Sequence, residues 1–225
     1  MKRTALLVSF VCMMSAAWSQ GQPSVNDSSF RAVYKAAALH PGYSSRNGIV
    51  YDSVIRRWDK NIVIYVIGGA GKEKRAILGK LKNTISLLSP SLSKISISFT
   101  DEMRSANYLI DLDYKGRSHW YITWDALGNI YKGNIYLNPR QIFNADQQAS
   151  LVSHYFYQTL GYFVFNRKDR DELLKGDPSI ASNIFVWRHD INDLDLRILK
   201  LHYSDDIKPG MAEKDVDQYF DKHTN

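Results

Sequence analysis

Cysteine is almost absent from this 225-residue sequence, since Cys12 is its only thiol. Cys12 lies in an N-terminal segment that we expect to be removed, so the remaining chain has no disulfide. Exported proteins without disulfides are more typical of a bacterial periplasm or cell exterior than of a eukaryotic secretory pathway. The sequence therefore predicts a bacterial protein whose stability comes from its packed core.

Long apolar runs are lacking too, and no later segment is apolar enough to cross a membrane. The stretch ALLVSFVCMMSAAW follows the positive pair KR and is too short to span a bilayer comfortably. With the small residues Ala17 and Ser19 before a cut, it predicts a signal peptide over residues 1–20. An uncleaved anchor is the alternative, but the polar SQGQPSVNDSS that follows favours release. We do not expect a lipoprotein, because Val11 precedes Cys12 where a small residue is required.

Concentrated charge of one sign and a phosphate-binding loop are also missing. The net charge of +6 is spread along the chain and accompanies no recognisable module, which argues against a nucleic-acid partner. In the glycine-rich IGGAGKEK, Val66 replaces the first glycine of a P-loop and Glu73 replaces its hydroxyl residue. We expect this segment to be an ordinary turn from a strand into a helix.

The patterns that are present predict an α+β domain. We expect a flexible, loosely attached N-terminal lead over residues 21–46, with a short helix in FRAVYKAAALH, and a single domain over residues 47–225. In that domain the β-branched run NIVIYVIGG predicts a buried strand, and apolar residues at helical spacing predict a helix over 72–88. Four further strands are predicted in KISISF, NYLIDLDY, HWYITWD and NIYKGNIYLN.

Helices follow these strands. Asn144 is a good N-cap for a helix over residues 144–161, and Gly161 suits the left-handed position at its end. In INDLDLRILKLHY, Asn192 and Asp195 form the pattern of a capping box. The tail KPGMAEKDVDQYF predicts a last helix.

The segment SHYFYQTLGYF, residues 153–163, has the rhythm of a zinc-protease helix. Such helices place two histidines four residues apart, so that both imidazoles bind one zinc, and a glutamate after the first histidine activates water. Here His154 matches the first histidine, but Tyr155 replaces the glutamate and Gln158 replaces the second histidine. Val164 stands at the position of a third ligand. One zinc ligand of three remains, and the general base is lost.

The order of the surrounding motifs resembles the metzincins, in which a strand, a helix and further strands with an antiparallel edge strand precede the active-site helix. The resemblance assigns SNIF, with Phe185 for methionine, to the Met-turn and INDLDLRILKLHY to the C-terminal helix. The sequence is similar, more closely, to a family of bacterial secreted proteins described only as a domain of unknown function. YQTLG, NIF, DLDLRILKLHY and KPGM follow that family's order over residues 50–212, although His154 and Tyr155 replace its two glutamates.

The resemblance implies a metzincin-like or zincin-like α+β fold, with a mixed, mostly parallel sheet packed on an active-site-type helix and a C-terminal helix. It implies a secreted, non-catalytic domain without a cofactor. A lone helical histidine is usually structural, so we expect His154 to pack or to donate to a carbonyl, with a vestigial metal contact as the alternative. The alternative is an active zinc-dependent hydrolase or peptidase with an atypical ligand set. Residues near the motif that could complete such a set, or supply a base, are Asp169, Asp171, Glu172, His189 and His202.

Aromatic residues offer a second kind of site. In a metzincin, HWYITWDALGNIY would form the rim of the cleft, where a substrate strand pairs with the edge strand. The side chains expected there are Trp120, Tyr121, Trp124 and Tyr131, which could stack on sugars or pack on a peptide. Peptide and glycan are therefore both candidate partners, and core packing of the same rings is the alternative.

Overall fold

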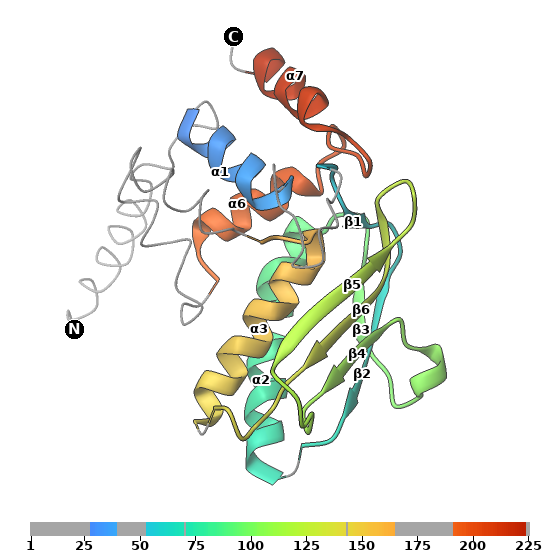
Figure 1. The fold of residues 1–225 in the computed structure, drawn as a ribbon, viewed down its shortest axis with the longest axis vertical. Coiled ribbons are helices and arrows are strands. Elements are labelled where there is room, and N and C mark those ends of the chain that lie inside the picture. Colours follow the sequence, from blue (N-terminus) through green and yellow to red (C-terminus); the bar gives the residue numbers. More distant parts are fainter. Residues whose placement is uncertain (1–27, 40–52, 70, 143, 165–190, 224–225) are drawn as a thin grey trace, which may run out of the picture.

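The described part of the chain forms eleven α-helices and β-strands. The computed structural model describes residues 28–39, 53–69, 71–142, 144–164 and 191–223 (Figure 1). Two short 3-10 turns, η1 (Ser89–Ser91) and η2 (Met103–Ser105), accompany the following elements: α1 (Ser28–Ala38), β1 (Arg57–Trp58), β2 (Ile62–Ile67), α2 (Gly71–Leu88), β3 (Ile97–Phe99), β4 (Tyr108–Asp111), β5 (His119–Trp124), β6 (Asn129–Tyr136), α3 (Ala145–Gly161), α6 (Asp193–His202) and α7 (Glu213–His223).

The strands form one mostly parallel sheet. Its order is β1-β6-β4-β2-β3, and all of these neighbours pair in parallel. β5 pairs with β6 alone among the described strands, and it runs antiparallel. The predicted α+β class, with a mostly parallel sheet and an antiparallel edge strand, is confirmed. The expected strands and helices of the described residues form, and the two-residue strand β1 is an addition that the sequence pattern did not predict.

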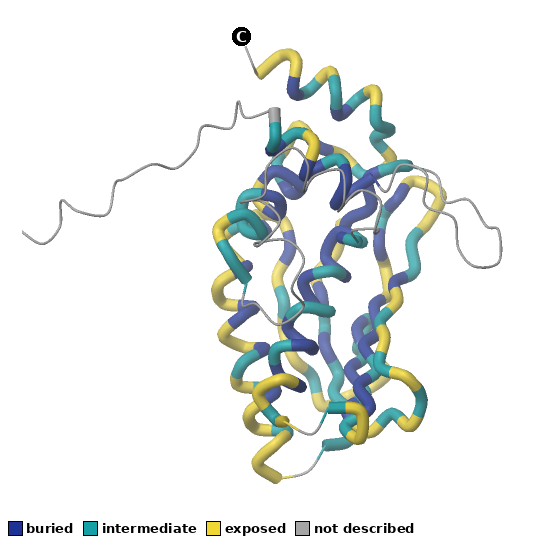
Figure 2. Tube along the Cα trace, turned by 60° about the vertical axis from the view of Figure 1, so that its left-hand side comes forward, coloured by how far each residue is buried: buried dark blue, intermediate teal, exposed yellow. Residues whose placement is uncertain are grey.

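Helices α2 and α3 lie side by side on one face of this sheet (Figure 1). Ile77, Leu81 and Ile85 recur at helical spacing along α2, and all three are buried in the core. From the strands, Ile64, Ile110 and other residues of the same face are buried with them. Figure 2 shows the buried residues on the facing sides of helices and strands, with exposed residues on the outer helix surface.

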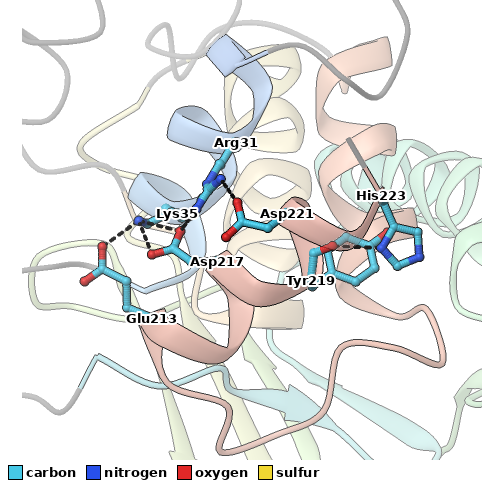
Figure 3. A network of polar contacts seen from close by, with 7 residues as sticks. All are labelled: Arg31, Lys35, Glu213, Asp217, Tyr219, Asp221 and His223. Atoms are coloured by element: carbon cyan, nitrogen blue, oxygen red, sulfur yellow. Dashed lines mark hydrogen bonds and ion pairs between the residues drawn. The ribbon is translucent and has the colours of Figure 1, made fainter. Parts of the chain in front are cut away.

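The N-terminal helix α1 differs from our expectation of a loosely attached lead. Val33 and Tyr34 are fully buried, and Phe30 packs edge-on against Phe220 of α7. On its outer side, Arg31 and Lys35 both form ion pairs with Asp217 of α7 (Figure 3). The helix is therefore part of the core, because its apolar side covers surfaces of α6 and α7 that would otherwise face water.

The glycine-rich turn before α2 is structural, as expected. Gly68 and Gly69 have φ angles of 69° and 67°, in the left-handed region that suits glycine. The backbone N–H of Gly69 donates to the carboxylate of Asp113 at 2.9 Å, and a Cβ on Gly68 would collide with that carboxylate. Asp113 thus occupies the turn in which a P-loop would hold phosphate.

Candidate functional site

The candidate site is built on α3, whose position follows from its sequence. Asn144 caps the helix as predicted, because its side chain accepts hydrogen bonds from the backbone N–H groups of Asp146 and Gln147. Phe156 then packs edge-on against Tyr108 of β4, which seats the helix on the sheet. His154, Tyr155 and Gln158 of the zinc-protease pattern are partly exposed, whereas Phe156 is fully buried.

His154 faces the neighbouring helix. It lines a cavity of about 390 Å³ between α2 and α3, together with Lys80, Asn83, Thr84, Leu87, Ser150, Ser153 and Ile191. Burial lowers the pKa of its imidazole below the ordinary value of 6.5, which favours the neutral ring. Neutral imidazole is the form that binds a metal, but the groups around it are hydroxyls, an amide and an amine.

Gln158, at the position of the second histidine, turns instead to the edge strand. Its Oε1 accepts a hydrogen bond from Nε1 of Trp120 at 2.8 Å, which ties α3 to β5. Tyr155, at the position of the glutamate, donates from its hydroxyl to the carbonyl of Ser118 at 3.4 Å. Burial raises the pKa of this phenol above 10, so it stays protonated at neutral pH.

The third aligned position is also used structurally. The backbone N–H of Val164 donates to the carbonyl of Ala37 at the end of α1. Within the residues that the structure describes, no cluster of three or more His, Cys, Asp or Glu side chains could hold a metal ion. The remaining candidate ligands Asp169, Asp171, Glu172 and His189, and the Met-turn position Phe185, lie outside the described residues.

His202, the one described candidate beyond α3, is a core residue. Its Nε2 lies 2.9 Å from the carbonyl of Arg56, which can only accept, so Nε2 carries the proton. Nδ1 then accepts from the hydroxyl of Tyr34 at 3.1 Å. Burial lowers the pKa of this ring to about 3. Both nitrogens of this neutral side chain are therefore occupied, so His202 is not a zinc ligand as we expected it could be.

The end of α3 differs from our expectation that Gly161 takes the left-handed position. Gly161 is the last helical residue, and Tyr162 takes the left-handed conformation, with φ 55° and ψ 38°. Gly161 is required for space, because a Cβ there would lie 2.8 Å from Nε2 of His202 and closer still to the ring of Phe163. Non-glycine residues rarely adopt a positive φ, so the surroundings must hold Tyr162 in place.

An aromatic cluster supplies that constraint. The ring of Tyr162 meets Trp120 edge-on at 5.6 Å and lies 5.3 Å from Trp124, both from β5. The guanidinium of Arg56 lies 4.5 Å from the centre of the Trp124 ring, at cation–π distance. Trp120, Trp124 and Tyr162 are partly exposed, whereas Arg56 is buried. We call Arg56, Trp120, Trp124, Gln158 and Tyr162 the aromatic cluster.

The four residues expected at a cleft rim therefore do not share one surface. Trp120 and Trp124 point toward α3, whereas Tyr121, between them on the strand, points to the other face of the sheet. Tyr131 is exposed where the pairing of β5 and β6 shifts register. Sequence reasoning missed Arg56 and Tyr162, because both reach the cluster through tertiary contacts and neither belongs to a local pattern.

Comparisons with models of protein families, with curated proteins and with solved structures find no match to this chain. Among its described helices, none has the length and apolar character needed to cross a membrane.

Proposed function

We propose that this protein is an exported, non-catalytic metzincin-like domain that binds an extended peptide beside β5 and α3. The observation that carries the proposal is the hydrogen bond between Trp120 and Gln158. It uses the position of the second zinc-binding histidine to fasten the helix to the edge strand. The three aligned positions after His154 hold a phenol, an amide and an aliphatic side chain, none of which matches the chemistry of a zinc peptidase.

The order of elements supports the metzincin-like reading. β2 and α2 come first, further strands follow, and the antiparallel strand β5 precedes β6 and α3. This is the order that the sequence resemblance implies. In the described part of the chain, β5 pairs with β6 on one side and has no partner strand on the other.

Peptide is favoured over glycan for this site because an unpaired strand edge offers main-chain hydrogen bonds to an added strand. The partly exposed rings of Trp120, Trp124 and Tyr162 lie beside that strand and supply apolar surface for peptide side chains. The contact of Gln158 with Trp120 and the buried Arg56 hold these rings in position before a ligand arrives.

Binding of purified residues 21–225 to an array of random short peptides tests the proposal, with metal analysis on the same sample. We expect peptide binding, substoichiometric zinc and no peptide cleavage. Trp124→Ala should weaken binding about tenfold, as the loss of an interfacial tryptophan does. Leu127→Ala is the control, because Leu127 is 69% exposed in the turn after β5 and lies outside the aromatic cluster.

One tightly bound zinc that is lost in His154→Ala would replace this proposal with the hydrolase. Binding to glycans alone, abolished by Trp124→Ala, would instead assign the aromatic cluster to carbohydrate. Export is tested separately, by the mass of the protein isolated from its host. A mature chain that begins near residue 20 or 21 supports export, and retention of Met1 contradicts it.

A further inference from the structure

The sheet face opposite α2 and α3 carries a second, chemically different surface. Pairing across β2, β4, β6 and β5 places two rows of four side chains on it. Alternation along each strand puts both rows on the same face, away from the helices seen in Figure 1. We call this surface the open face, and its rows are Tyr65-Leu109-Asn134-Tyr121 and Ile67-Asp111-Tyr136-His119.

Rings gather at one end of the open face, around Tyr136. The ring of His119 stacks on Tyr136 at 4.9 Å and 19°, and the ring of Tyr121 lies nearly parallel to Tyr136 at 6.0 Å and 16°. Tyr114, from the loop after β4, lies 4.9 Å from the same ring. Tyr121 is 42% exposed and His119 is also exposed, so the group presents aromatic surface to solvent.

Polar groups lie among these rings. Asn134 is 1% exposed, and its Nδ2 has no hydrogen-bond partner in the described part of the protein. Its neighbours across the sheet are Leu109 and Tyr121. Asp111 pairs in register with Tyr136 and is partly exposed. Burial and a hydrogen bond with Tyr121 raise the pKa of Tyr136 to about 12, so its phenol remains a neutral hydrogen-bonding group.

We propose that the open face binds a carbohydrate chain, with sugar rings against Tyr121 and His119 and sugar hydroxyls on the Asp111 carboxylate and the Asn134 amide. Each sugar hydroxyl both donates and accepts, so one ligand satisfies the carboxylate, the phenols and the amide. Nδ2 of Asn134 is buried beside Tyr121, so a sugar hydroxyl reaches it only when the Tyr121 side chain, which is 42% exposed, shifts on binding. This site is separate from the aromatic cluster, which lies on the other face of β5.

Other occupants fit the open face less well. An apolar protein surface would remove the partly exposed carboxylate of Asp111 from water with one hydrogen bond, from the backbone N–H of Asp113. It would also offer no partner to Nδ2 of Asn134, and an unsatisfied buried polar group costs about 1–3 kcal/mol. A nucleic acid could stack on the rings, but its phosphates would be repelled by the carboxylate beside them. Carbohydrate is therefore the partner whose chemistry matches both the rings and the polar groups.

Calorimetric titration of residues 21–225 with tetrasaccharides of glucose and of N-acetylglucosamine, and sedimentation with insoluble peptidoglycan, test this proposal. We expect at least one probe to bind, and Tyr121→Ala to weaken its binding about tenfold through loss of a stacking ring. Asp111→Asn should weaken binding as well, since its amide keeps the shape but loses the charged acceptor. Phe99→Ala is the control, because Phe99 is an exposed ring on β3, in register with the helix-facing Ile64.

Thermal unfolding of each variant shows whether it is folded. Failure of the wild type to bind any of the three probes would overturn the proposal, as would binding that Tyr121→Ala and Asp111→Asn leave unchanged. A wild type that is dimeric in solution, is made monomeric by Tyr121→Ala and binds no probe would assign the open face to self-association instead. Trp124→Ala should leave saccharide binding intact, so the outcome is independent of the peptide site.

Discussion

At the scale of single residues, the group with the clearest measurable consequence is His202. Burial holds the pKa of its imidazole at about 3 in the folded protein, whereas an unfolded histidine titrates near 6.5. Between these values the unfolded chain binds one more proton than the folded chain, so stability falls as the pH falls. This histidine alone should remove up to about 1.4 kcal/mol from the free energy of unfolding per pH unit below 6.5.

Urea denaturation at pH 7 and pH 5 measures this dependence when the wild type is compared with His202→Gln. Glutamine can donate to the carbonyl of Arg56 and accept from Tyr34, but it does not titrate. Burial raises the pKa of Asp195 to about 6, which changes stability in the opposite direction, and this contribution cancels in the comparison. Equal pH dependence in the two proteins would show that His202 is not held neutral.

Gly161 makes a second prediction at the residue scale. Gly161→Ala adds a Cβ against Phe163 and His202, both of which are buried and cannot move aside freely. We expect a loss of about 2–3 kcal/mol in the free energy of unfolding. Gly79→Ala is the matched control, because a Cβ at this exposed site in α2 meets no other atom and should stabilise the helix by about 0.5–1 kcal/mol. Similar effects at both positions would contradict the packing argument.

At the scale of elements, the contact between α1 and α7 combines an apolar core with a set of ion pairs. Asp217 accepts from Arg31 at 2.7 Å and from Lys35 at 2.9 Å, whereas the ion pair of Asp221 among the described residues is with Arg31 (Figure 3). The side chain of Asp217 is 29% exposed and that of Asp221 is 66% exposed, so the second pair is more strongly screened by solvent.

Asp217→Asn should therefore lower the free energy of unfolding by about 0.5–1 kcal/mol at low salt, and by less at 1 M salt. Asp221→Asn should have a smaller effect at both salt concentrations. Chemical denaturation in urea, which adds no ions, resolves the two variants. A larger loss for Asp221→Asn would mean that the shared carboxylate of Asp217 is not the main electrostatic contact between the helices.

At the scale of the whole molecule, the burial of α1 predicts which chain lengths fold. A protein of residues 21–225 should unfold as cooperatively as the full-length chain, because it keeps α1. A protein of residues 47–225, the domain predicted from the sequence, loses the buried Phe30, Val33, Tyr34 and Leu39. The loss is on the order of 5 kcal/mol or more, which is comparable with the total stability of a typical domain.

Thermal unfolding followed by circular dichroism compares the two lengths. We expect a sharp transition for residues 21–225, and a strongly lowered or missing transition for residues 47–225. Equal midpoints would show that α1 contributes little to the core and that the loosely attached lead was the better description.

The local patterns of the sequence determined most of the elements and the class of the fold. β-branched runs and helical spacing of apolar residues depend on near neighbours alone, so β2, α2 and the later strands could be located without a structure. The caps Asn144 and Asn192 are equally local, because each side chain bonds to N–H groups within three residues. The spacing of His154, Tyr155 and Gln158 on α3, which we interpret as a degenerate zinc-protease pattern, is local as well.

Only the tertiary structure decided where these residues point and what they contact. His154 and Gln158 are four residues apart on one helix, yet one lines a cavity beside α2 and the other bonds to Trp120 of β5. The roles of Gly161 and α1 also depend on the folded chain, because His202 and α7, which contact them, are distant in sequence. Contacts between residues distant in sequence leave no periodic signal, because they depend on how whole elements pack against each other.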